Sequence, residues 1–326
     1  MINLPFLSNC TPDAVRNAAI ALRAGRLVAF PTETVYGLGA DARNAAAVRR
    51  VYEVKGRPTD HPLIVHISSI NQIEKWACEI PDYAISLARA FWPGSMTLIL
   101  KRTDAVGDFI TGGQDTVGLR VPNHPIALAL IENFESISDS AIAAPSANRF
   151  GQVSPTTAQA VYSELSEYLA PDDQILNGGA SYVGVESTII DCTGKSPRIL
   201  RPGAITEDMI VQATDMLLMF EVSNYELPRI RVSGSLDSHY SPFARVFLDQ
   251  SPIAGQGFIA FADIPTPEGV VRLANPKNSE EFARVLYASL RDADEKGLSI
   301  VVVQQPQGDG LALAIRDRLR RAANDR

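Results

Sequence analysis

The sequence predicts a mixed α/β protein with a larger first domain and a smaller second one. The chain has 326 residues, 46% of them hydrophobic, which is enough for about two domains with buried cores. Before Arg201, strand-like and helical patterns alternate irregularly, which favours an α+β domain with a twisted mixed sheet over a doubly wound one. After Pro242, a regular βαβα order predicts a small Rossmann-like, three-layer α/β domain.

The first domain opens with a predicted helix over residues 11–25. Thr11 is a capping hydroxyl, Pro12 suits the first turn, and Gly25 ends the apolar repeat. The apolar and turn patterns then predict these elements in order: strand 27–30, helix 44–56, strand 63–67, helix 81–91, strands 96–100 and 117–121, helix 125–134, strand 141–144, helix 154–169, and strands 189–192 and 198–200. Ser154-Pro155 is the expected start of the last of these helices.

The stretch 201–242 is rich in proline and glycine and has one helical pattern, over residues 207–219. Because structureless connections beyond about 12–15 residues are usually functional or disordered, we interpret it as a linker that acts as a lid. The second domain is predicted from strand 257–262, helix 279–295, strand 298–304 and helix 311–323. The expected division is therefore 1–203, 204–242 and 243–326.

The composition limits the classes of function. The formal net charge is −7, which argues against tight general binding of nucleic acid because such proteins carry a basic excess. The three cysteines, Cys10, Cys78 and Cys192, are too far apart to suggest a metal clip or a disulfide framework. The chain start lacks a signal-peptide pattern, and no apolar run approaches the roughly 18 residues of a membrane span. We expect a cytoplasmic protein.

Two apparent nucleotide motifs fail on their context. Gly194-Lys195-Ser196 resembles the end of a phosphate-binding loop, but the position that needs the first glycine is Ile189, inside a predicted strand. Gly37-Leu38-Gly39 weakly resembles a dinucleotide fingerprint, but no helix is predicted to follow it.

Three other segments combine polar, glycine and proline residues at the ends of predicted strands or helices, where functional residues gather. They are Phe30 to Gly39, Lys55 to Pro58 with His61-Pro62-Leu63, and Ala144 to Asn148.

These segments resemble YrdC-type domains. The pairs Lys55-x-Arg57 and Ser146-x-Asn148 match the family's KxR…SxN signature, and the runs PTETVYGLG at 31–39 and ESTI at 186–189 match in the same order. The resemblance covers about residues 11–203. The tail from His239-Tyr240-Ser241-Pro242 is similar to that of the two-domain threonylcarbamoyl-AMP synthases.

The resemblance implies an enzyme that condenses L-threonine, bicarbonate and ATP, with Mg²⁺, to threonylcarbamoyl-AMP and pyrophosphate. The product would pass to a separate transferase complex that makes threonylcarbamoyladenosine in tRNA. By the same resemblance, ATP would contact Lys55, Arg57, His61, Thr116, Ser146, Asn148, Ser154, Arg201 and Tyr240. Threonine would contact Thr34, His66, Arg120, Ala144 and Ser187. His61 is a departure, because the family pattern leads us to expect asparagine there.

The residue types suit this chemistry. Phosphoryl transfer requires positioning and charge neutralisation more than a nucleophilic side chain. Lys55 supplies a point charge, and Arg57 and Arg201 supply planar forks for phosphate oxygens. Arg120 suits the carboxylate of an amino acid, and Ser154 could cap a helix whose N-terminus favours anions. Mg²⁺ would bridge phosphate oxygens with few protein ligands.

Simpler structural interpretations compete at several positions. Lys55 and Arg57 could lie on a solvated helix end, and His66 could be a core histidine. His124 suits a helix cap, and Arg318 and Arg321 suit a solvated helix face. The aromatic residues in helical context are expected in the core: Trp76, Phe91 and Trp92.

Two other functions stay open at this point. One is an RNA-binding YrdC-like module, against which the acidic balance argues. The other is a carbamoyltransferase that uses carbamoyl-phosphate, although such enzymes carry further domains.

Overall fold

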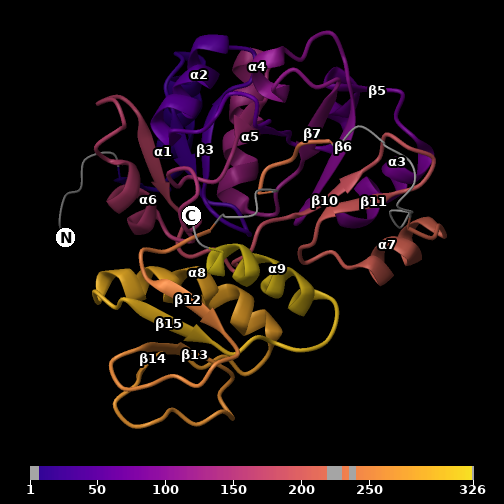
Figure 1. Ribbon diagram of the computed structural model, residues 1–326. Helices are drawn as coiled ribbons and strands as arrows, with labels where there is room; N and C mark the ends of the chain where they lie inside the picture. Colours follow the sequence, from indigo (N-terminus) through magenta and orange to yellow (C-terminus); the bar gives the residue numbers. More distant parts are fainter. Residues whose placement is uncertain (1–6, 219–229, 235–239, 325–326) are drawn as a thin grey trace.

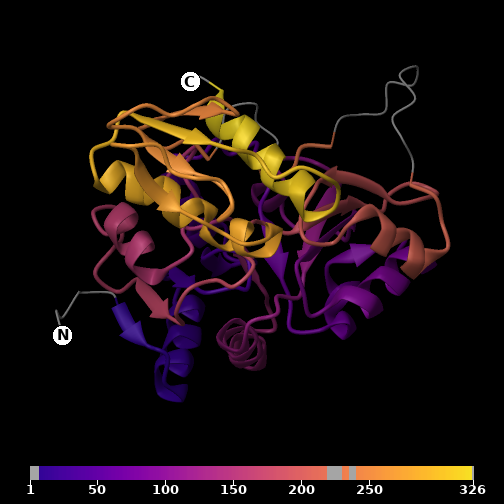
Figure 2. The same ribbon diagram turned by 90° about the horizontal axis from the view of Figure 1, so that it is seen from below.

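The computed structural model describes residues 7–218, 230–234 and 240–324. These residues form an 11-stranded mixed sheet and a separate four-stranded sheet, which confirms the predicted mixed α/β class. The smaller sheet lies below the larger domain in Figure 1, and helices α8 (Ser279–Glu295) and α9 (Leu311–Ala323) lie between the two. The view from below shows the same helices crossing over the larger domain (Figure 2).

The large sheet has the order β1-β9-β2-β3-β8-β4-β7-β6-β10-β11, with β5 paired to β6. Its strands are Leu7–Asn9, Val28–Phe30, Gly37–Asp41, Ile64–His66, Ala77–Cys78, Met96–Arg102, Thr116–Arg120, Ile142–Ala144, Gln174–Asn177, Thr188–Asp191 and Arg198–Arg201, numbered β1 to β11. Strand β3 has no counterpart among the predicted elements because two of its residues are glycines. A Cβ on Gly39 would stand 2.7 Å from Ile142, so glycine allows this close strand contact.

The helices of this domain are Pro12–Arg23, Ala45–Lys55, Asp82–Phe91, Asp108–Thr111, Pro125–Ser138 and Ala158–Leu165, labelled α1 to α6, with a short 3₁₀ helix at Ile70–Lys75. Thr11 caps α1 as predicted, since its Oγ1 accepts a hydrogen bond from Ala14 N at 3.2 Å. The prediction that Ser154 starts α6 is wrong: Thr157 caps this helix. The Ser154 hydroxyl is buried and donates to Glu186 instead.

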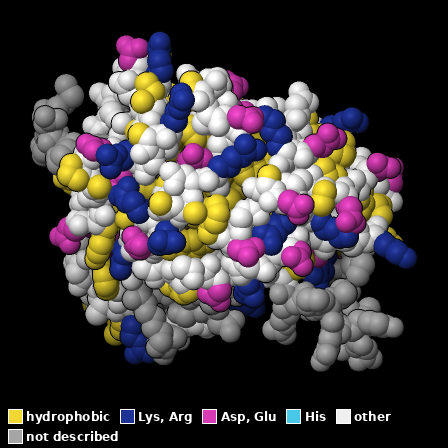
Figure 3. Space-filling view, turned by 90° about the horizontal axis from the view of Figure 1, so that it is seen from above, with side chains coloured by type: hydrophobic (Ala, Val, Ile, Leu, Met, Phe, Trp, Pro, Cys, Tyr) yellow, Lys and Arg dark blue, Asp and Glu magenta, His cyan; other side chains and the backbone are white. Residues whose placement is uncertain are grey.

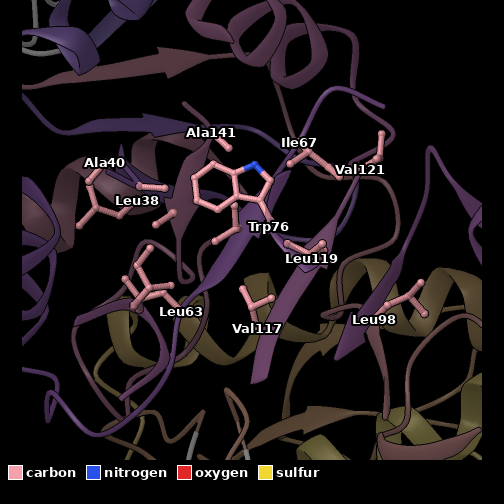
Figure 4. Packing of buried hydrophobic residues seen from close by; sticks show 14 of the residues in the cluster. Leu38, Ala40, Leu63, Ile67, Trp76, Leu98, Val117, Leu119, Val121 and Ala141 are labelled. Atoms are coloured by element: carbon pink, nitrogen blue, oxygen red, sulfur yellow. The ribbon is translucent and has the colours of Figure 1, made fainter. Parts of the chain in front are cut away.

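The two faces of the large sheet carry different helices. The larger core, on one face, includes residues of α2, α3 and α6, and Trp76 lies among Leu38, Leu63 and Leu119 (Figure 4), as expected for a core residue. On the other face, α1 and α5 pack against the part of the sheet around β2, β8 and β9.

Beyond α5 on that second face, the described linker residues Ile230 and Val232 pack on Ile99 of β6 and Ile189 of β10. The linker therefore covers this part of the sheet in place of a helix.

The linker helix α7 spans Glu207–Thr214, which is shorter than the predicted 207–219. Asp215 ends it in the left-handed conformation, with φ 53°. The end of the predicted helix at Met219 lies outside the described residues.

The small domain has a parallel sheet in the order β12-β15-β13-β14, made of Arg245–Leu248, Gly257–Ile259, Val271–Ala274 and Ile300–Val303 for β12 to β15. Helices α8 and α9 pack on one face, against Val246, Ile259 and Val301. The other face packs against a loop that carries Ile264 and Val270. The helical layer is therefore on one face, and a loop takes the place of the second helical layer of a three-layer domain. Among the helices that the structure describes, none is long and apolar enough to cross a bilayer.

Candidate active site

A cavity of about 50 Å³ lies where the linker covers the large sheet. Seven of the predicted site residues line it: Arg57, His66, Arg120, Ala144, Ser146, Arg201 and Tyr240. They come from the ends of α2, β4, β7, β8 and β11 and from the end of the linker, at Tyr240. The fold thus brings together residues that are far apart in the sequence.

At one end of the cavity, Arg120 and Glu33 form a buried ion pair. Arg120 Nη2 donates to Glu33 Oε1 at 2.6 Å and to Thr34 Oγ1 at 2.9 Å. Glu33 also accepts hydrogen bonds from Ser95 Oγ and from the backbone N–H of Asn123. Arg120 Nε is buried and has no hydrogen-bond partner among the described residues. The ion pair fixes the guanidinium, which keeps an N–H group for a ligand carboxylate.

His66 lies beside Arg120, its register partner in the β4–β7 pair. Burial, with a further contribution from the Arg120 charge, lowers the pKa of His66 to about 3, so the imidazole is neutral near pH 7. Its ring stands edge-on to Phe30 at 5.8 Å. His66 Nδ1 is buried without a partner in the described part of the chain. A satisfied core histidine would not leave this nitrogen unpaired, so the nitrogen is available to a hydroxyl or amine.

Lys55 fastens the end of α2 to the turn that contains Ser146 and Asn148. Its Nζ donates to the Ser146 carbonyl at 2.6 Å and also to the Asn148 carbonyl. The side chain is 1% exposed, so the interpretation as a solvated helix end is wrong. Burial lowers the pKa of Lys55 well below its ordinary value, and the charge of Arg57 lowers it further. Asn148 Nδ2 bonds the carbonyls of Arg149 and Gln152, which holds the same turn.

Arg57 and Arg201 both bind the linker residue Ser233. Arg57 Nη2 donates to Ser233 Oγ at 3.2 Å and to the Pro62 carbonyl at 3.0 Å. Arg201 Nη1 donates to the Ser233 carbonyl at 2.8 Å, and its Nε donates to the Ser187 carbonyl. Burial lowers the pKa of Arg57 to about 10, which keeps it charged at neutral pH. In this structure the linker accepts hydrogen bonds that these two guanidinium groups could give to phosphate.

Glu186, from the ESTI run, is a buried carboxylate in the cavity wall. Its Oε1 accepts from Ser154 Oγ at 2.6 Å, and its Oε2 accepts from Tyr287 Oη at 2.8 Å and Arg318 Nε at 2.9 Å. Burial alone would raise the pKa of Glu186. The charges of Arg318 and Arg201 and the hydrogen bonds outweigh burial and lower it to about 2.

Arg318 corrects a prediction, because it is fully buried and does not lie on a solvated helix face. Helix α9 turns this side chain toward the first domain, where its Nη2 donates to the Pro202 carbonyl at 2.9 Å. Arg321 does not lie on a solvated face either, since its side chain is 14% exposed and bonds Asp317 on the same helix. The Tyr240 ring stacks on Tyr287 with 5.6 Å between centroids, so the second domain also supports the predicted nucleotide contact.

The other seven predicted contacts lie outside the cavity lining. Four of them, Thr34, Lys55, Asn148 and Ser154, bond the residues around the cavity as described above, and the remaining three are His61, Thr116 and Ser187. His61 is half-buried and stands edge-on to Phe150 at 5.3 Å; burial is the main cause of its lowered pKa. Thr116 begins β7, about 13 Å along the strand from Arg120. Ser187 is buried, and its hydroxyl lies 2.8 Å from Thr97 Oγ1. His124 caps α5 as expected, since its Nδ1 accepts from Ile126 N.

Glu33 and Glu186 lie within the matched motifs, but the sequence predicted no role for them. The available signal was an acid between two threonines just after one buried strand, and an acid two residues before another. The structure also adds Ser233 and Gly234 to the cavity lining. Among the residues described here, no group of three or more histidine, cysteine or acidic side chains could hold a metal ion.

Two family models match the chain in succession. Residues 20–203 match the Sua5–YciO–YrdC model, described as telomere recombination. Residues 205–324 match the C-terminal domain of threonylcarbamoyl-AMP synthase.

Similar proteins cover nearly the whole chain. Threonylcarbamoyl-AMP synthase of Pyrococcus abyssi is 40% identical over 328 residues, covering 96% of this chain and 94% of that protein. The enzyme of the same name from Bacillus subtilis is 38% identical over 338 residues, covering 98% and 95%. The crystal structure of P. abyssi Sua5 complexed with L-threonine superposes with a TM-score of 0.85 at 38% identity, covering 97% of each chain.

Proposed function

This chain belongs to the Sua5–YciO–YrdC family, and on that premise we propose that it condenses L-threonine, bicarbonate and ATP to threonylcarbamoyl-AMP and pyrophosphate. The product is the activated group for threonylcarbamoyladenosine formation in tRNA. One observation carries the proposal: the same cavity contains a fixed arginine for a carboxylate, Arg120, and two arginines for phosphates, Arg57 and Arg201.

The end with Arg120 suits threonine. The substrate carboxylate would accept from Arg120 Nε, with Thr34 beside it, because Glu33 already holds the Nη2 group. Neutral His66 offers its unpaired Nδ1 to the substrate hydroxyl or amine, and the small side chain of Ala144 leaves room for it. Ser187 completes the proposed set.

The end with Arg57 and Arg201 suits the triphosphate, with Ser146 and Tyr240 beside it. Lys55 and Asn148 hold the surrounding backbone, Ser154 bonds Glu186, and His61 and Thr116 would lie farther out toward the nucleoside. The threonine amine takes up bicarbonate as a carbamate with loss of water. A carbamate oxygen then attacks the α-phosphorus, and pyrophosphate leaves with its Mg²⁺. Mg²⁺ enters with ATP as part of the substrate, and the protein supplies positioning and positive charge.

The linker acts as a lid in this proposal. A cavity of about 50 Å³ holds a few water molecules, whereas small-molecule sites are about 300–1,000 Å³. ATP therefore requires Ser233 to leave Arg57 and Arg201, and reclosure would keep the hydrolysable adenylate from water. Proteolysis between Glu221 and Ser238 should slow when ATP and threonine are added together. A cleavage rate that does not change when ATP and threonine are added would show that the linker only connects the two domains.

Neither alternative function gains support. On the face seen from above, lysine and arginine side chains alternate with acidic ones and form no broad basic field (Figure 3). The match of the second domain to the C-terminal domain of threonylcarbamoyl-AMP synthase disfavours a carbamoyl-phosphate enzyme.

The reaction is tested by product analysis after incubation with ATP, Mg²⁺, threonine and bicarbonate. We expect pyrophosphate and an adenylate that carries threonine and one carbon from bicarbonate. Pyrophosphate release at an equal rate without threonine or without bicarbonate would contradict the assignment. Transfer to tRNA by this chain alone would contradict the need for a separate transferase complex.

A further inference from the structure

Glu186 presents a contradiction within a site for ATP. It lines the cavity together with Arg57 and Arg201, and its folded-state pKa of about 2 makes it an anion at neutral pH. An unscreened carboxylate in the wall of a phosphate site would repel the triphosphate, and the low dielectric of a buried site strengthens that repulsion. A compensating charge must therefore act on Glu186.

That charge comes from the second domain. Arg318 of α9 is fully buried, and its Nε donates to Glu186 Oε2 at 2.9 Å. Its remaining nitrogens bond Asp317 and the Pro202 carbonyl, and its guanidinium carbon lies 5.6 Å from the Tyr240 ring centroid. These contacts fix the guanidinium in one orientation.

We propose that Arg318 is a positioning residue of the nucleotide site, which neutralises Glu186 and holds its carboxylate so that ATP phosphates can bind to Arg57 and Arg201. This inference rests on the proposed function, because it takes the cavity as the ATP site. It assigns the second domain an electrostatic role in a site whose direct contacts come from the first domain and the linker.

The other groups that face Glu186 agree with this role. Its two oxygens accept from Ser154 and Tyr287 as well as from Arg318, and the charge of Arg201 also lowers its pKa. Tyr240 stacks on Tyr287 and keeps a raised pKa of about 12, so it adds no charge near neutral pH.

The test uses the full chain and compares Arg318→Met, Glu186→Gln and the double variant. ATP affinity is measured by titration without turnover, beside KM and kcat. We expect Arg318→Met to weaken ATP binding at least about tenfold, the equivalent of 1.4 kcal/mol. The double variant should stay within about threefold of the natural chain, because neutralising both partners of a buried pair is often tolerated. Glu186→Gln alone should do the same, because Arg318 keeps Asp317 and the Pro202 carbonyl as partners.

Two further measurements separate charge from structure. Lower pH should improve ATP binding by Arg318→Met, because without its partner Glu186 regains a higher pKa and becomes protonated. Arg320→Met is the matched control, since Arg320 also bonds Asp317 but its side chain is 69% exposed. It should leave ATP affinity unchanged. Thermal melting of every variant reports folding, and the double variant still tests the proposal if Arg318→Met is unfolded.

A folded double variant as weak as Arg318→Met would overturn the proposal, because Arg318 would then act only on packing. Loss of ATP binding in Glu186→Gln alone would overturn it as well, since the carboxylate would have a direct role. Failure of the proposed function is distinguishable from both outcomes: the natural chain itself would then not bind ATP or not release pyrophosphate in response to threonine.

Discussion

The end of the cavity that we propose for threonine is built by the first domain alone, whereas the end that we propose for the nucleotide combines three parts of the chain. At the threonine end, Arg120 is held by Glu33 and Thr34, all within the first domain. At the nucleotide end, Arg57 and Arg201 bond Ser233 of the linker, and Glu186 bonds residues of α8 and α9.

This difference separates two ways of preparing a site. The threonine end is preorganised, so threonine binding requires little rearrangement. The nucleotide end depends on a linker that must release two arginines and on a second domain that supplies a compensating charge. Substitutions at the first end should therefore affect threonine alone, and changes in the linker or second domain should affect ATP.

The largest expected effect is at the threonine end. Arg120→Met leaves Glu33 buried without its ion-pair partner, which should lower the free energy of unfolding by about 3–5 kcal/mol and abolish threonine binding. Adding Glu33→Gln should restore most of the stability but not the binding. Chemical denaturation and threonine titration measure the two effects. Threonine affinity that survives in the double variant would remove Arg120 from the site.

At the nucleotide end, Glu186 should make part of the free energy of unfolding depend on pH. The pKa of Glu186 falls from an ordinary 4.5 to about 2 on folding, so its contribution is fully present above about pH 4.5 and is lost as pH falls toward 2. The contribution is on the order of 3 kcal/mol. Chemical denaturation at pH 7, 4 and 3 should show that the free energy of unfolding falls less steeply with falling pH in Glu186→Gln than in the natural chain. Parallel curves for the two proteins would contradict the ion pair.

Substitution of the proposed phosphate contacts should have the next largest effect. Arg57→Ala should weaken the free energy of ATP binding by about 1.5–3 kcal/mol, which is about a 10- to 100-fold loss of affinity. Threonine affinity should be unchanged. Arg57→Lys should also weaken binding, because an ammonium cannot replace a planar fork. Lys55→Ala should act through the turn at Ser146 and Asn148. Activity close to that of the natural chain in both Arg57→Ala and Lys55→Ala would contradict the proposed phosphate site.

The smallest effect is expected in the linker. Ser233→Ala removes the hydroxyl that accepts from Arg57 and donates to Pro62, and so weakens the closed state of the ligand-free protein. Because one hydrogen bond contributes about 0.5–1.5 kcal/mol, ATP should bind about 2- to 10-fold more tightly. Calorimetric titration measures this change, and weaker ATP binding would show that Ser233 belongs to the bound state.

The sequence could predict features that depend on local chemistry. The caps of α1 and α2 follow from Thr11 and Asn44. The resemblance to YrdC-type domains, and not local chemistry, placed Arg57 and Arg201 in one site, and both line the cavity. Strand β3 was missed because its glycines are chosen for close contact with neighbouring strands and carry no strand signal of their own.

Other features depend on partners that are far away in the sequence and could not be predicted from local patterns. Arg318 lies in an arginine-rich helix that looks solvated in sequence, and its partner Glu186 is 132 residues away. Ser154 looked like a helix cap because it precedes a proline, but the same distant carboxylate captures its hydroxyl. No local pattern reports either pairing.

The central claim, one preorganised end and one assembled end, is tested most directly by titrating threonine and ATP into residues 1–203 and into the full chain. The buried clusters of the first domain are formed almost entirely by residues before Gly203, so this fragment retains its own core. We predict threonine affinity within about threefold of the full chain and ATP affinity at least about tenfold weaker, a difference of 1.4 kcal/mol or more. An equal fall in both affinities, or undiminished ATP binding, would contradict the account.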